Sequence, residues 1–217
     1  MKLLRILLIG FEPFGKYKEN SSWAVAEKVT ACGVVEAEAI AKRLPVSFAG
    51  VGTALRKAVE ECHPDVIIML GQAAGVDYIK LERIAINMMD ATIADNNGYI
   101  PDEEPIYADG TAALFTNVDI KKIRRAIEEL GFPVKVSNSA GLYVCNRTYY
   151  EALRLCNERP GMKALFVHLP LYEGQPSAVY GLPAMPLDDM ASAIETIIHK
   201  INYTDAKIQE TTCAHIR

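Results

Sequence analysis

The chain has 217 residues, of which half are apolar and 23% are charged, and this composition is ordinary for one globular domain. The formal net charge is −4, so the sequence lacks the basic character of proteins that bind nucleic acid or anionic membranes. No apolar run approaches the roughly 20 residues of a membrane span, and a single domain over residues 1–217 is predicted.

Short apolar runs alternate with amphipathic segments along the chain. The runs are nearly continuous, as in strands that helices cover on both faces of a sheet, and the amphipathic segments repeat apolar residues every three to four positions. This alternation predicts a layered α/β fold. In chain order, the predicted elements are strands over 3–9 and 34–39, a helix over 51–62, strands over 66–70 and 81–86, a helix over 120–130, a strand over 134–137, a helix over 143–157, a strand over 164–169 and a helix over 190–201.

Three segments lack this periodicity. Residues 90–110 are rich in Asp, Asn, Gly and Pro, and a loop of this length in a compact domain usually serves as a lid, a binding loop or an assembly element. Residues 172–186 form a second predicted loop. Residues 203–217 show no convincing pattern and are predicted to form a loosely ordered tail.

Cysteine usage favours a reducing compartment. The chain has five cysteines, an odd number, and no two of them form a C-x-x-C pair. A secreted disulfide framework is therefore disfavoured, and a cytoplasmic location is predicted. Because the sequence contains no H-E-x-x-H motif and no zinc-ribbon spacing, no metal site is predicted.

Cys145 lies at a predicted strand-to-helix turn, in the segment Ser-Ala-Gly-Leu-Tyr-Val-Cys-Asn over 139–146. A helix N-terminus favours the nucleophilic thiolate form of a cysteine, and the free N–H groups of a first helical turn can hold an oxyanion. The alternative interpretation is a small buried hydrophobic residue. That alternative is preferred for the other cysteines, which are Cys32, Cys62, Cys156 and Cys213.

Two further residues are candidates for a nucleophile–base–orienter set with Cys145. His168 closes the predicted strand 164–169 and is followed closely by Pro170, so it is expected at the edge of the sheet. Its alternative role is that of a hydrogen-bonded structural histidine. Glu82 stands in an otherwise apolar strand and could orient the imidazole, or it could simply pair with the neighbouring Arg83.

Two glycine-framed loops follow predicted strands. The first, Gly-Phe-Glu-Pro-Phe-Gly-Lys over 10–16, nearly matches a phosphate-binding loop, but Tyr17 replaces the hydroxyl residue and Pro13 removes a backbone donor. Phe11 and Phe14 instead predict an apolar pocket wall. The second loop begins with Leu-Gly-Gln, and its Gln72 offers a side-chain amide.

Taken together, these motifs resemble the pyroglutamyl peptidase I family, also called pyrrolidone-carboxylate peptidases. The resemblance covers nearly the whole chain and rests on seven segments in the family's order: 10–15, Leu-Pro-Val over 44–46, 70–72, Glu-Arg-Ile-Ala-Ile-Asn over 82–87, Asp-Asn over 95–96, 139–146 and His-Leu-Pro over 168–170. It implies Glu82, Cys145 and His168 as catalytic residues, and it implies that Phe11, Phe14 and Gln72 line the substrate pocket.

The resemblance also implies a fold and an activity. The implied fold is a three-layer α/β/α sandwich with a twisted mixed sheet, similar to phosphorylases and hydrolases. The implied activity is the removal of N-terminal pyroglutamate from peptides through a thioester, with no metal or cofactor, by a homo-oligomer (tetramer or dimer) in the cytoplasm. The implied partners are therefore peptides with N-terminal pyroglutamate, with neither nucleic acid nor membrane.

The chain departs from the family at two positions near the expected site. Many members have arginine where this chain has Thr92, and many have histidine where it has Arg147. Two other functions stay open beside the peptidase. One is a non-catalytic protein that binds lactams or peptides, and the other is an enzyme of the nucleoside phosphorylase type with a phosphate site at 10–16.

Overall fold

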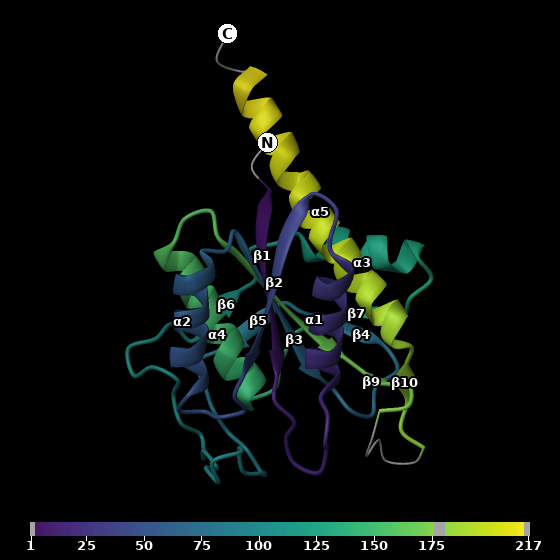
Figure 1. The fold of residues 1–217 in the computed structure, drawn as a ribbon. Coiled ribbons are helices and arrows are strands. Elements are labelled where there is room, and N and C mark those ends of the chain that lie inside the picture. The colour runs from purple at the N-terminus through teal and green to yellow at the C-terminus, as the bar shows by residue number, and fades with distance from the viewer. Residues whose placement is uncertain (1–2, 176–180, 215–217) are drawn as a thin grey trace.

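The computed structural model describes residues 3–175 and 181–214, with side chains described as far as Ile201. Within these residues the chain forms ten strands and five helices (Figure 1). In chain order they are β1 (Leu4–Phe11), α1 (Ser21–Cys32), β2 (Ala37–Leu44), α2 (Val51–Cys62), β3 (Val66–Gln72), β4 (Ile79–Glu82), β5 (Ile84–Ile86), β6 (Ala113–Phe115), α3 (Ile120–Glu129), β7 (Val134–Ser137), α4 (Val144–Glu158), β8 (Lys163–Leu169), β9 (Leu171–Tyr172), β10 (Ala184–Met185) and α5 (Leu187–Ala214).

A six-stranded mixed sheet forms the middle layer, in the order β2-β1-β3-β8-β4-β7. Neighbouring strands are parallel except for β4 and β8, which pair antiparallel. Helices α1, α3 and α5 cover one face, and α2 and α4 cover the other (Figure 1). The predicted three-layer α/β/α fold is confirmed.

The two faces of the sheet carry separate hydrophobic clusters because side chains alternate along each strand. In β1, for example, Ile6 and Leu8 face the α1/α3/α5 layer, whereas Leu7 and Ile9 face the α2/α4 layer. All seven residues of β3 are buried. The continuous apolar runs of the sequence therefore mark the central strands, as predicted.

Two predicted strands were wrong in detail. The run 81–86 does not form one strand, because it breaks at Arg83 into β4 of the main sheet and β5, which pairs with β6 in a separate small sheet. The strand predicted over 34–39 instead runs over Ala37–Leu44, following a tight turn around Glu36, whose φ is positive. In both places apolar residues continue through a bend that hydrophobicity alone does not reveal.

The last helix is longer than its apolar pattern predicted. Residues 203–214, expected to form a loosely ordered tail, continue the backbone of α5, which projects beyond the three layers in Figure 1. The final part of that predicted tail, residues 215–217, lies outside the described residues. So does the stretch 176–180 of the predicted loop 172–186.

Candidate active site

Glu82 and His168 are brought together by the one antiparallel pair of the main sheet. The register of β4 and β8 places Glu82 opposite Phe166 and Lys80 opposite His168, so Glu82 and His168 are diagonal neighbours on the same face. His168 Nδ1 lies 2.8 Å from Glu82 Oε1, and the Glu82 side chain is fully buried. The alternative interpretation was an ion pair between Glu82 and Arg83, but the observed partner of Glu82 Oε1 is His168.

Cys145 completes this arrangement from the helical layer. It lies in the first turn of α4, which packs against β8 on the face that carries His168. The thiol is half-buried and within hydrogen-bonding reach of the imidazole ring. The order thiol, imidazole, carboxylate is therefore that of a nucleophile, its base and the group that orients the base.

The electrostatics of His168 favour its charged form. Burial is the largest single effect and lowers the pKa of the ring, but the hydrogen bonds and charges of Cys145 and Glu82 outweigh it and raise this pKa to about 9. The imidazolium therefore loses its proton only as the pH rises through about 9. At neutral pH the ring carries the proton that an acid in amide cleavage has to deliver.

The other cysteines have different surroundings. Cys62 and Cys156 are buried, and burial raises the pKa of the Cys156 thiol to about 12, which makes it a poor nucleophile. Cys32 was predicted to be buried but is exposed, because it occupies the last position of α1. The side chain of Cys213 lies outside the described residues.

The first turn of α4 is held in place by Asn146, whose role the sequence did not reveal. The Asn146 side-chain amide accepts a hydrogen bond from Ile86 N (3.0 Å) and donates to the carbonyl oxygens of Ile86 and Met88 (2.9 Å each). The N-cap residue, Tyr143, makes no side-chain cap. Asn146 thus fixes the start of α4. The side chain of the N-cap residue leaves the backbone N–H groups of the first turn uncapped.

A small pocket opens beside Cys145. The predicted residues Phe11, Phe14 and Gln72 all line it, and Phe11 and Gln72 stand at the carboxyl ends of β1 and β3. Four lining residues were not predicted from the sequence: Asn20, Val46, Tyr143 and Val144. Its lining is mostly apolar, which suits an apolar group.

Gln72 contributes a single polar group to this pocket. Its Oε1 accepts hydrogen bonds from Ser21 N (2.9 Å) and from Gln175 Nε2 (2.8 Å). Its Nε2 is buried and has no hydrogen-bond partner among the described residues. A residue that lines the pocket therefore carries a buried donor that lacks an acceptor.

Comparison with known proteins decides the family. A sequence model described as pyroglutamyl peptidase matches residues 4–203. The pyrrolidone-carboxylate peptidase of Clavibacter michiganensis is 38% identical over 94% of this chain and 96% of the relative, and that of Thermococcus onnurineus is 40% identical over 90% and 97%. The chain belongs to the pyroglutamyl peptidase family.

Solved structures agree with this assignment. The pyrrolidone carboxyl peptidase from Thermococcus litoralis superposes with a TM-score of 0.88 at 31% identity, over 94% of this chain and 96% of that structure. The pyroglutamyl peptidase I from Bacillus amyloliquefaciens gives a TM-score of 0.85 at 33% identity, over 90% and 93%. The resemblance found from the sequence motifs is therefore confirmed.

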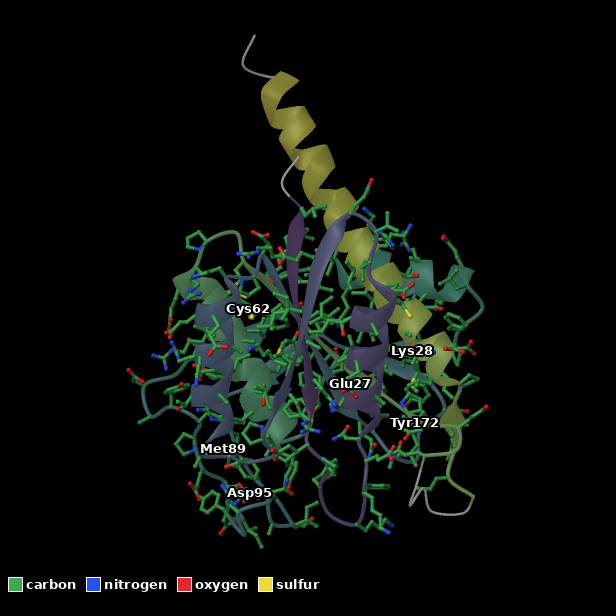
Figure 2. All side chains as sticks on the ribbon, in the orientation of Figure 1. Glu27, Lys28, Cys62, Met89, Asp95 and Tyr172 are labelled. Atoms are coloured by element: carbon green, nitrogen blue, oxygen red, sulfur yellow. The ribbon has the colours of Figure 1, made fainter. Side chains whose placement is uncertain are left out.

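Within this pyroglutamyl peptidase fold, the loop 90–110 packs against segments that line the pocket but contributes no lining residue itself. Asn96 donates to Pro13 O (3.0 Å) from its side chain and to Val46 O (2.9 Å) from its backbone, and Tyr143 donates from its hydroxyl to Ala94 O (2.9 Å). Figure 2 places Asp95 of this loop at the end of the molecule opposite Cys62. The loop is thus tied to three segments that line the pocket.

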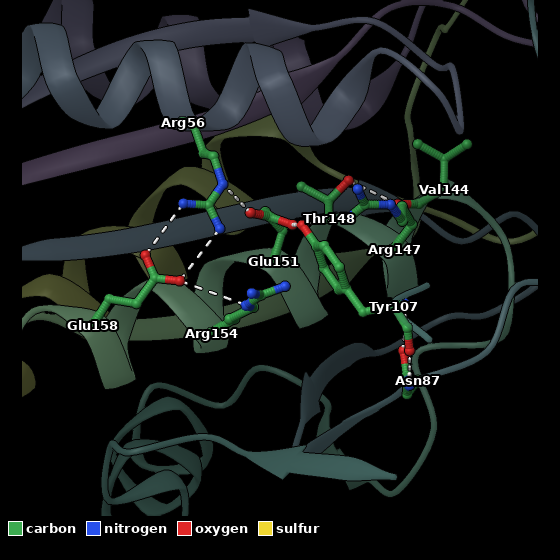
Figure 3. A network of polar contacts seen from close by, with 9 residues as sticks. All are labelled: Arg56, Asn87, Tyr107, Val144, Arg147, Thr148, Glu151, Arg154 and Glu158. Carbon is green, nitrogen blue, oxygen red and sulfur yellow. Dashed lines mark hydrogen bonds and ion pairs between the residues drawn. The ribbon is translucent and has the colours of Figure 1, made fainter. Parts of the chain in front are cut away.

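The two departures from the common family pattern lie in different surroundings. Thr92 is exposed on the loop just described. Arg147 is directed into a buried network, where it pairs with Glu151 at 2.9 Å (Figure 3). In the described part of the chain there is no cluster of three or more side chains suited to bind a metal ion, and no helix there is both long and apolar enough to span a bilayer.

Proposed function

We propose that this chain is a cysteine exopeptidase that hydrolyses the amide bond after an N-terminal pyroglutamyl residue. The observation that carries this proposal is the hydrogen-bonded order Cys145, His168 and Glu82 beside a small apolar pocket. Gln72, which lines that pocket, carries a buried donor without a partner among the described residues. Membership of the pyroglutamyl peptidase family supports the proposal.

The pocket chemistry suits a neutral lactam ring. Phe11 and Phe14 would bury the faces of the ring, while Gln72 Nε2 would donate to its carbonyl oxygen. An ordinary N-terminal glutamate would bring an ammonium group and a carboxylate into the same apolar space. Removing water from these charges costs several kcal/mol, so such peptides would be excluded.

The proposed reaction runs through a thioester. The Cys145 sulfur attacks the carbonyl carbon of the pyroglutamyl residue, and the oxyanion is held by the N–H groups of the first turn of α4. His168 donates its proton to the leaving amine as the C–N bond breaks. Water then attacks the thioester carbonyl while His168 takes its proton, releasing pyroglutamate and restoring the thiol. Glu82 orients the ring and stabilises its positive charge throughout.

We also propose that the chain assembles as a homo-oligomer, which the family resemblance implies, and that it is cytoplasmic, which the cysteine pattern favours. The phosphorylase alternative would need phosphate bound at 10–16, where Pro13 lacks an N–H and Glu12 adds negative charge. The non-catalytic alternative rests on Thr92 and is separated from the peptidase by the experiment below.

The test is cleavage of a pyroglutamyl-coumarin amide by the wild-type protein, with Cys145→Ser as the inactive variant and Cys32→Ser as the matched control. We expect Cys145→Ser to lower kcat/KM by about a thousandfold or more, because the weakly acidic hydroxyl is a poor nucleophile beside this base. Cys32→Ser changes an exposed thiol and should leave the rate unchanged.

Two outcomes would contradict the peptidase proposal. If the wild type cleaves no faster than Cys145→Ser, but calorimetry detects binding of 2-pyrrolidone, the chain is a binding protein. If turnover requires phosphate and survives alkylation of thiols, the phosphorylase interpretation holds instead.

A further inference from the structure

A second glutamine stands behind the pocket and contacts Gln72. Gln175 is almost completely buried and follows directly after the turn that begins at β9. Its Nε2 donates to Gln72 Oε1 at 2.8 Å. Gln175 does not line the pocket, and its contact with Gln72 joins residues 103 positions apart.

The orientation of both amides is fixed by backbone partners. The N–H of Ser21 can only donate, so the atom of Gln72 that faces it must be the carbonyl oxygen. For Gln175, the carbonyl of Glu19 accepts from Nε2 (3.1 Å), and the N–H of Tyr172 donates to Oε1 (3.3 Å). Neither amide can therefore be turned over without placing two donors or two acceptors face to face.

This arrangement determines which group of the Gln72 amide is left without a partner beside the pocket. Its oxygen is occupied by two donors, so its NH₂ group is left as the group that has no partner among the described residues. Because an unpartnered buried donor is unfavourable, a bound group that offers an acceptor there is favoured over one that does not.

The turn that carries Gln175 is itself anchored. Gln175 N donates to Tyr172 O at 3.1 Å, and Gly174 takes a φ of +79° that the turn requires. The Tyr172 hydroxyl also donates to Glu19, just before α1. Figure 2 shows Tyr172 at the end of the molecule where α1 begins. The position of Gln175 is thus fixed by its own backbone bond within the turn and by its side-chain bond to Glu19 O, while the Tyr172 hydroxyl adds only an exposed contact beside them.

We propose that Gln175 is a positioning residue that orients the Gln72 amide and so makes the pocket selective for acyl groups with a ring carbonyl. The inference rests on the proposed peptidase function, which it deepens. Gln175 acts through Gln72 and touches no reacting atom, so it should affect the recognition of the ring and not the reactivity of Cys145.

The test compares two substrates that differ in one atom. Pyroglutamyl-coumarin amide has a ring oxygen, and its thiolactam analogue has a sulfur, which is a weaker acceptor of the same Gln72 donor. The ratio of their kcat/KM values measures how well the pocket donates a hydrogen bond to the ring. We expect Gln175→Met, which keeps the length of the side chain but cannot donate, to lower this ratio about three- to tenfold, the range of one net hydrogen bond.

Two further variants separate orientation of the amide from general loosening of the turn. Gln175→Glu also lacks the donor and should lower the ratio in the same direction, and it replaces Gln175→Met if that variant does not fold. Tyr172→Phe removes the hydroxyl contact with Glu19 in the same turn but leaves Gln175 in place. Its ratio should equal that of the wild type.

The inference is overturned if a folded Gln175 variant keeps the wild-type ratio, or if Tyr172→Phe lowers the ratio as much as Gln175→Met does. Failure of the proposed function looks different, because the wild type would then cleave neither substrate. The kcat/KM ratio of the two substrates is compared between each variant and the wild type. The steric effect of the larger sulfur is common to all these proteins and therefore cancels.

Discussion

Two carboxylates without exposed side-chain surface, Glu82 and Glu151, have opposite surroundings. Glu82 has His168 as its partner, and its Oε2 has no hydrogen-bond partner among the described residues. Glu151 lies between Arg147 and Arg56 and also accepts from the Tyr107 hydroxyl (Figure 3). Burial is the largest effect on the pKa of Glu151 and raises it, but these three partners outweigh burial and lower it.

The contrast separates a reactive carboxylate from a structural one. Tyr107 comes from the loop 90–110, Arg56 from α2 and Glu151 from α4, so the Glu151 network joins three segments with fixed charges. Gly52 leaves room for the Arg147 guanidinium, since a Cβ at position 52 would lie 2.6 Å from it. The partner of Glu82, in contrast, is a ring that can gain and lose a proton. A buried carboxylate with a titratable partner can orient and stabilise a catalytic base, whereas one held by arginines has fixed charges as its partners.

The largest expected effect is on catalysis. Glu82→Gln keeps the shape of the side chain but removes the charge that stabilises the imidazolium of His168. We expect kcat for the pyroglutamyl-coumarin amide to fall about a hundredfold or more, with a smaller change in KM. The kcat and KM of purified enzyme provide the measurement. A kcat within twofold of the wild type would mean that Glu82 is not the orienting group.

The next effect is on stability. Glu151→Gln leaves Arg147 and Arg56 facing a neutral amide, and breaking a buried ion pair in this way costs about 3–5 kcal/mol. Urea denaturation measures the free energy of unfolding. Glu158→Gln is the matched control, because Glu158 also pairs with Arg56 but is well exposed, so its loss should cost less than about 1 kcal/mol. Equal losses in the two variants would show that burial of Glu151 does not distinguish them.

The smallest expected effect concerns pH. Because the raised pKa of His168 keeps the ring charged until the pH passes about 9, a positive charge that favours nucleophilic attack stays beside the Cys145 sulfur throughout the neutral range. We expect inactivation by iodoacetamide, followed as loss of peptidase activity, to vary less than about threefold between pH 7 and 8.5. An unactivated thiol with a pKa of ~8.5 would react more than tenfold faster at the upper pH. A steep rise of that kind would show that His168 does not activate the nucleophile.

The sequence predicted the parts of the fold that hydrophobic periodicity controls. The strands 66–70 and 164–169 were found because β3 and β8 are buried on both faces. The break at Arg83 was missed because apolar residues resume at Ile84, in a different sheet. Periodicity reports burial, and burial continues across that break.

The candidate site divides in a similar way. Cys145 and His168 were recognisable because each is a reactive side chain at the end of a predicted element. Gln175 and Asn146 act through hydrogen bonds to residues 103 and about 60 positions away, and no local pattern marks such partners. Residues that orient others are therefore harder to predict than residues that react.

The antiparallel pairing of β4 with β8 has a consequence for how such a protein can change over evolution. The carboxylate and the imidazole lie two rungs apart on the same face of one ladder, so their separation does not depend on the length of any surface loop. Changes in the length of the loop 90–110 would therefore leave the pairing of Glu82 with His168 undisturbed. Variation of that surface loop is thereby uncoupled from the geometry of the pair.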